Sequence, residues 1–270
     1  MAADEIVGLL EDSVDRFNAW RAGHVEADVD LSGANLMGQS LRGANLRGAK
    51  LAGADLTGVD LGDAILDDAS MEGCDLTEAR LVNASLVNAH LVSAKLVGAN
   101  LSGANLAGAA LHMADLQHAH LVGANLTGAT LSGASLNLAN FAHAQLDQAQ
   151  LNHATLAHAN LWGATMQYAA LQDADLSHVN MQGATLIGSN MTGADLREAD
   201  LRDSMLGQVN LRRADVRGAT FEGASLEHTD FQLAQTEGAD FSDAQKTEET
   251  KFDAPDISDI DWGTGAPGAL

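Results

Sequence analysis

The sequence predicts an all-β solenoid, and three observations support that fold. An apolar residue recurs every fifth position from Leu31 to Phe241 without an insertion, at 43 positions of which 33 are leucine and only Thr236 is polar. A small residue, usually alanine, stands two positions before nearly every one of them. Aromatic residues make up only 4% of the chain, so leucine and alanine must fill the core.

A period of five residues fits neither a regular helix nor a straight strand. On an α-helix of 3.6 residues per turn the leucines would drift around the surface, and on a strand an odd spacing would put them on alternate faces. The chain must therefore turn a corner every five residues. Alanine and leucine, two positions apart, then point inward together, and glycine, which is commonest two positions after leucine, suits the corner.

The repeating units resemble those of the pentapeptide-repeat family. Examples are Ala-Asn-Leu-Ala-Gly at 104–108, Ala-Asn-Leu-Thr-Gly at 124–128 and Ala-Asp-Leu-Arg-Glu at 194–198. The resemblance covers roughly residues 29–245 and implies a right-handed quadrilateral β-helix with four repeats per coil. The residues alone do not distinguish four sides from three.

The two ends differ from the repeats, and we expect three segments: residues 1–28, 29–245 and 246–270. Residues 4–21 place apolar side chains at helical spacing, which predicts a short N-terminal capping helix, because solenoid ends expose their cores. Residues 17–21 also resemble the amino-terminal cap of family members. The register should fail after Ala244, because Lys246 and Lys251 fall at core positions. We expect the last coil to be covered by Phe252, Ile257, Ile260 and Trp262.

Composition excludes several classes of function. The chain has 37 acidic and 14 basic residues and a net charge of −23, which argues against binding nucleic acid or an anionic membrane through a basic surface. It shows no apolar run near the ~20 residues of a membrane span and no secretory signal, so we expect a cytoplasmic protein. We expect no catalytic residue, cofactor or metal, because a convex solenoid of small side chains offers no concave site.

The charge is unevenly distributed along the sequence. Residues 1–78 hold 16 acidic and 5 basic residues, residues 79–194 hold 4 and 2, and residues 195–270 hold 17 and 7. The resemblance implies one alternative function, since some family members mimic DNA, bind bacterial DNA gyrase and confer quinolone resistance. Duplex DNA carries one charge per ~1.7 Å, far more than the nearly neutral middle of this chain. The candidate DNA-mimicking patch is therefore an acidic cluster before it: Asp60, Asp63, Asp67, Asp68 and Glu72.

The nearly neutral middle holds a second candidate site, a stripe of outward apolar and imidazole side chains. With four repeats per coil, histidines and a leucine share one column, a valine and a tryptophan share another, and Asn140, Asn160 and Asn180 stack beside them. Two stacked histidines without a third ligand make a poor zinc site. We therefore interpret the stripe as a surface for a protein partner, or for a second copy of the chain that could also pair through a cap. The stripe comprises His118, His120, Val122, Leu138, His158, Trp162 and His178.

Overall fold

The computed structural model describes residues 3–253 and residue 262. It begins with two helices, α1 (Ala3–Asp12) and α2 (Val14–Gly23), where the sequence pattern predicted one. The helices separate at Ser13, whose backbone is extended (φ −170°, ψ 126°) and whose side chain accepts a hydrogen bond from the Arg16 N–H at 3.4 Å. Serine is a preferred residue at this position because it caps the free N–H groups of the following helix.

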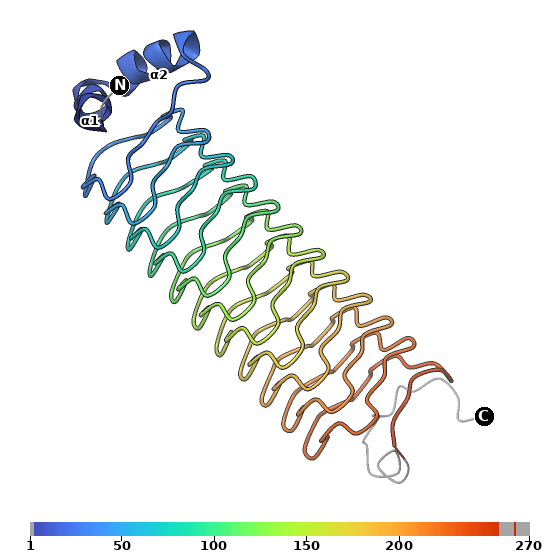
Figure 1. Ribbon diagram of the computed structural model, residues 1–270. Coiled ribbons are helices and arrows are strands. Elements are labelled where there is room, and N and C mark those ends of the chain that lie inside the picture. The colour runs from blue at the N-terminus through green and yellow to red at the C-terminus, as the bar shows by residue number, and fades with distance from the viewer. Residues whose placement is uncertain (1–2, 254–261, 263–270) are drawn as a thin grey trace. The chain divides into compact units, whose positions relative to one another are not determined.

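The repeats wind into coils, each made of four repeats (Figure 1). Parallel bridges join the residue in the middle of a side to its equivalent four repeats later, as in Asn105 with Asn125 and Thr185 with Met205. Each coil therefore has the four sides that the resemblance implied, while its right-handed sense stays a prediction. The β structure consists of isolated bridges rather than extended strands, because the chain turns again after each paired residue.

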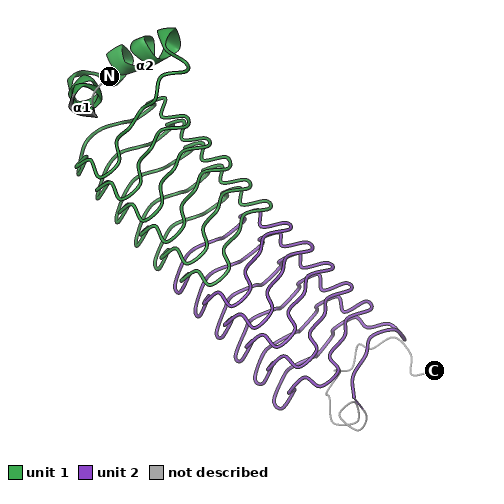
Figure 2. Ribbon diagram, in the orientation of Figure 1, with its two compact units in different colours: residues 1–135 green, residues 136–270 purple. Residues whose placement is uncertain are grey.

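The chain divides into two compact units, residues 1–135 and residues 136–270 (Figure 2). Within each unit the predicted facing of the repeat is confirmed. Ala124 and Leu126 of unit 1 and Ala159 and Leu161 of unit 2 are fully buried, as are most of their equivalents. The equivalents that are only half-buried belong to the first and last coils: Ala34, Gln39, Ala234, Thr236 and Ala239. Each buried leucine contributes ~1.5–3 kcal/mol of hydrophobic stabilisation, most of which offsets the entropy of ordering the chain.

The N-terminal helices cover the first coil. The Asn18 side chain donates to the Gly43 carbonyl at 2.9 Å and accepts from the Asn45 N–H at 2.8 Å. Arg21 is buried, and its guanidinium donates to the Arg47 carbonyl at 2.8 Å and to two carbonyls of the segment after α2. These bonds satisfy backbone groups that no preceding coil can reach, so residues 17–21 act as the predicted cap.

The register slips near the C-terminus, where we expected it to fail. Asp230 forms its parallel bridge with Lys251, one position beyond the four-repeat spacing, and the Phe231 N–H donates to the Lys251 carbonyl at 2.8 Å. One extra residue therefore moves Lys251 out of the core position, which Phe252 takes, and the rings of Phe231 and Phe252 stack at 4.6 Å. Trp262 packs on the same cluster, 5.8 Å from Phe252. The other predicted covering residues, Ile257 and Ile260, lie outside the described residues.

Candidate partner-binding surface

The polar residue in the middle of each side organises the corner that follows it. Where this residue is asparagine or aspartate, its side-chain oxygen commonly accepts a hydrogen bond from the backbone N–H two residues on, as Asn160 does from Trp162 at 3.2 Å. The second corner residue has a left-handed backbone, including φ 59° at His158 and 62° at Leu138. This conformation points the side chain away from the core, so long side chains at the corners stand exposed.

One surface of unit 2 gathers most of the predicted stripe. Trp162 is 45% exposed and Leu138 is 51% exposed. His158 and His178 stack with ring centroids 4.7 Å apart and planes within 5°, which confirms the predicted column. We define the unit 2 surface as Leu138, Asn140, His143, His158, Asn160, Trp162, His178 and Asn180.

A ladder of asparagines runs through the middle of the unit 2 surface. Asn180 Nδ2 donates to Asn160 Oδ1, and Asn160 Nδ2 donates to Asn140 Oδ1, each at 3.1 Å. The Asn140 and Asn160 oxygens also accept the backbone N–H groups of Ala142 and Trp162. The three carboxamides are therefore fixed in orientation, half-buried between exposed corner side chains.

The ring that contacts Trp162 is His143, which the sequence analysis did not place in the stripe. Their centroids are 4.4 Å apart with the planes at 66°, an edge-on contact. The His143 ring lies over the glycine of the next coil, since a Cβ on Gly163 would lie 2.8 Å from its Nδ1. His158, which shares the stripe with Trp162, belongs to the opposite corner of the same side. The sequence does contain a signal for this contact. His143 stands one coil before Gly163, which directly follows Trp162, so the four-repeat coil places the two rings at the same corner.

The remaining predicted residues of the stripe belong to unit 1. His118 and His120 are exposed, and Val122 is 38% exposed. His118 has the left-handed corner backbone, with φ 59°. All three thus face outward on unit 1, as predicted.

The comparison with protein families decides what these coils are. A family model described as pentapeptide repeats, in 8 copies, matches overlapping segments from residue 27 to residue 243. The chain belongs to the pentapeptide repeat family. No curated protein matches its sequence.

Several solved pentapeptide repeat proteins are similar to it. One is HetL, involved in heterocyst differentiation regulation in the cyanobacterium Nostoc sp., which is 29% identical over 84% of this chain and 92% of its own, with a TM-score of 0.46. Another is full-length QnrB1, a plasmid-mediated fluoroquinolone resistance protein, 17% identical over 87% of this chain and 96% of its own, with a TM-score of 0.41. A third, from the thylakoid lumen of Arabidopsis thaliana, is 31% identical over 47% of this chain and 72% of its own, with a TM-score of 0.25.

The acidic cluster of this pentapeptide repeat protein is paired with bases in unit 1. Arg47 lies 3.4 Å from Asp67 and 3.6 Å from Asp68, and Asp67 also accepts a hydrogen bond from the Val87 N–H. The other pairs join Asp60 to Arg80, Asp63 to Arg42 and Glu72 to His90. The five acids are therefore not a uniformly negative patch, because each lies against a basic side chain.

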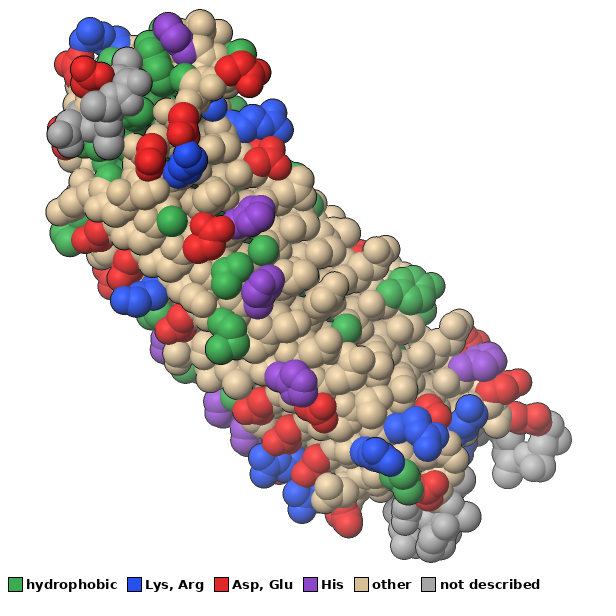
Figure 3. Space-filling view, in the orientation of Figure 1, with side chains coloured by type: hydrophobic (Ala, Val, Ile, Leu, Met, Phe, Trp, Pro, Cys, Tyr) green, Lys and Arg blue, Asp and Glu red, His purple; other side chains and the backbone are tan. Residues whose placement is uncertain are grey.

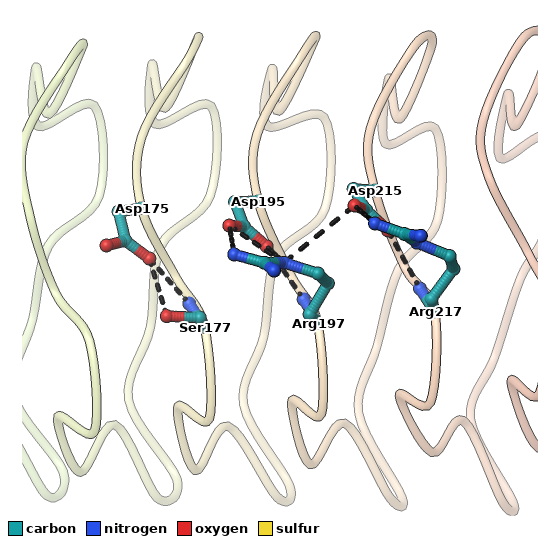
Figure 4. A network of polar contacts seen from close by, with 6 residues as sticks. All are labelled: Asp175, Ser177, Asp195, Arg197, Asp215 and Arg217. Atoms are coloured by element: carbon teal, nitrogen blue, oxygen red, sulfur yellow. Dashed lines mark hydrogen bonds and ion pairs between the residues drawn. The ribbon is translucent and has the colours of Figure 1, made fainter.

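Charges also lie close together over the carboxyl-terminal coils of unit 2, where acidic and basic side chains intermingle (Figure 3). In one column Arg197 Nη2 donates to Asp195 at 2.6 Å, and Arg217 Nη2 donates to Asp215 at 2.6 Å (Figure 4). Arg197 Nε also lies 3.8 Å from Asp215, which links two successive coils. The Arg197 side-chain hydrogen bonds hold the pKa of Asp195 below its usual value of 3.8.

This network predicts a dependence of stability on acidic pH. A carboxylate whose pKa is lower in the folded protein stabilises the fold above its ordinary pKa, and that contribution is lost as the pH falls through the folded pKa. Replacing Arg197 with glutamine should raise the pKa of Asp195 and start acid unfolding at a slightly higher pH, measured by circular dichroism. Arg213→Gln is the control, because Arg213 forms no ion pair with another described residue. An equal shift in both variants would contradict the prediction.

Metal binding, membrane spanning and cysteine reactivity can each be checked against the described residues. No group of three His, Cys, Asp or Glu side chains among them could hold a metal ion, and none of the helices in this part of the chain is long and apolar enough to cross a membrane. Cys74 is buried in the core at an alanine position, and desolvation raises its pKa to about 12. Its thiol is therefore protonated at neutral pH, as expected of an inert cysteine.

Proposed function

We propose that this pentapeptide repeat protein is a non-enzymatic interaction module of the cytoplasm that binds a protein partner through the unit 2 surface. The observation that carries the proposal is Trp162, a large aromatic side chain exposed beside a fixed asparagine ladder. The surface contains no Asp, Glu, Lys or Arg, although the two ends of the sequence are strongly acidic. Tryptophan is among the residues that contribute most to binding at protein interfaces. A partner can cover such a surface without the cost of desolvating charges.

A double substitution tests this proposal. Trp162→Ala with Leu138→Ser should weaken partner binding or self-association by at least about tenfold, because exposed aromatic anchors dominate interface energies. The thermal midpoint should stay nearly unchanged, since neither side chain belongs to the core. Binding is measured by crosslinking and affinity capture, and self-association by sedimentation.

The matched control is Tyr168→Ala with Met205→Ser. Both side chains are exposed and belong to unit 2, but they lie in other columns. This variant should retain binding. If the Trp162 variant captures and self-associates as the wild type does, the unit 2 surface is not the interface. If it unfolds, the facing of these side chains is wrong.

The alternative, a DNA mimic that binds gyrase, receives less support from the charges. Arg42, Arg47 and Arg80 lie against the acidic cluster, whereas a DNA backbone presents unpaired phosphates. We therefore expect micromolar protein to leave gyrase supercoiling unchanged. Inhibition that weakens when Asp63 and Asp68 are changed to asparagine, and at higher salt, would replace the interaction-module proposal by DNA mimicry.

A further inference from the structure

We infer that the partner presents an uncharged, proline-rich segment in the polyproline II conformation to the unit 2 surface. This inference rests on the proposed function and names the chemistry of the partner. Three properties of the surface support it: its hydrogen-bonding groups, the spacing of its asparagines, and its charge and size.

In the ladder the amide N–H donors are only partly used, while the oxygens of Asn140 and Asn160 are fully used; the Asn180 oxygen, at the end of the ladder, accepts only the Gln182 N–H among the described groups. A carboxamide has two N–H donors and an oxygen with two lone pairs. Asn160 uses one N–H on Asn140, and its oxygen accepts two bonds, from Asn180 and from the Trp162 backbone. Among the described residues, the second N–H of Asn160 and that of Asn180 have no partner. The oxygens of Asn140 and Asn160 are both fully used.

A proline-rich segment is the protein ligand that matches these free donors and occupied acceptors. Proline has a carbonyl acceptor but no backbone N–H, so a run of prolines offers acceptors and no backbone donor that would be left unpaired. An added β-strand would bring backbone N–H groups to a ladder whose middle oxygens are already occupied. Burying such unpaired donors is unfavourable.

The spacing of the ladder fits the same ligand. Successive coils are separated by about 4.8 Å, so asparagines two coils apart, such as Asn140 and Asn180, are separated by about 9.6 Å. A polyproline II helix advances about 9.3 Å per turn of three residues, so carbonyls of the same orientation recur at nearly that distance. Trp162 on one corner and the stacked His158 and His178 on the other supply aromatic faces for the proline rings. Aromatic surfaces are the usual receptors of polyproline II segments.

Charge and size favour a short neutral segment over a second copy of the chain. Three coils by one side cover on the order of 200 Å², whereas a stable protein interface buries about 800 Å² per partner. The unit 2 surface alone is thus too small for a stable homodimer. None of its eight residues is Asp, Glu, Lys or Arg, so the surface has no fixed charge of its own with which to select an acidic or a basic peptide.

The test uses the full-length protein and a fluorescent decaproline peptide, with a glycine–serine peptide of equal length for comparison. Fluorescence anisotropy should show saturable binding of decaproline and none of the flexible peptide. Trp162→Ala should weaken binding by at least about tenfold. Asn160→Asp should do the same, because it removes the amide donors and keeps the oxygen that caps the corner. Asp200 already plays that capping role in the same column, accepting the Arg202 N–H at 3.1 Å.

Asn105→Asp is the matched control, because Asn105 belongs to a similar ladder in unit 1, where it accepts from Asn125 at 3.2 Å. Its affinity for decaproline should equal that of the wild type. Binding that is unaffected by both Trp162→Ala and Asn160→Asp would overturn the inference, and so would equal binding of the glycine–serine peptide. If decaproline does not bind while partner capture still depends on Trp162, the proline-rich assignment falls and the proposed function stands. If decaproline does not bind and partner capture does not depend on Trp162, both the proline-rich assignment and the proposed function are wrong.

Discussion

Replacing Leu126 with aspartate should lower the free energy of unfolding by about 5 kcal/mol. Leu126 is fully buried in unit 1, in line with the other leucines of its column. The substitution removes its apolar contacts and places a carboxyl group where no described side chain can neutralise it. Urea unfolding followed by circular dichroism measures the loss.

The control for this substitution is Val122→Asp, which introduces the same carboxylate in the neighbouring repeat. Val122 occupies an outward corner position, and Glu72 and Glu222 occupy the same position of other repeats. Its stability should stay within about 0.5 kcal/mol of the wild type. Equal stability of the Leu126 variant and this control would mean that inward and outward positions are wrongly assigned.

Replacing Arg21 with alanine should cost about 2–4 kcal/mol, because a charged donor to three carbonyls is lost from a buried site. The substitution leaves the Arg47 carbonyl and two carbonyls after α2 without that partner. Fraying of the cap should also accelerate hydrogen exchange at the Asn45 N–H, which donates to Asn18. Chemical denaturation and hydrogen exchange measure the two effects.

Arg16→Ala tests whether the position of the arginine matters. Arg16 lies in the same helix, but its side chain is exposed and, among the described residues, pairs only with the exposed Asp12. An exposed pair of this kind contributes little to stability, so this variant should unfold like the wild type. A comparable loss in both variants would show that α2 depends on helix charge rather than on its bonds to the first coil.

The five-residue period allowed most of the fold to be predicted. It assigned the core positions and, with the family's four-sided coil, the columns that contain the asparagine ladder and the pair of His158 and His178. The same columns could have predicted the pairing of Arg47 with Asp67, since the two stand at the same position of successive coils. The net charge alone does not contain this pairing, because it counts the acids without their neighbours in adjacent coils.

Other features could not be obtained from the period. Apolar spacing continues through Ser13, so only the N-capping role of this serine divides the two helices. The slip before Lys251 depends on one inserted residue, for which the continued series of phenylalanines ending at Phe252 is the sequence signal. The contact of His143 with Trp162 depends on side-chain torsions, which the repeat leaves open.

The confinement of contacts to adjacent coils has a consequence for how such a chain can change length. Within the repeats of each unit, backbone bonds between coils connect residues about four repeats apart, and corner caps connect residues two positions apart. Duplicating or deleting one whole coil therefore gives each remaining coil neighbours of the same kind and preserves every column. A change of a single repeat rotates all later columns by one side and dismantles ladders such as Asn140–Asn160–Asn180. Internal duplication by whole coils is thus a route by which length can evolve while a surface built from columns is retained.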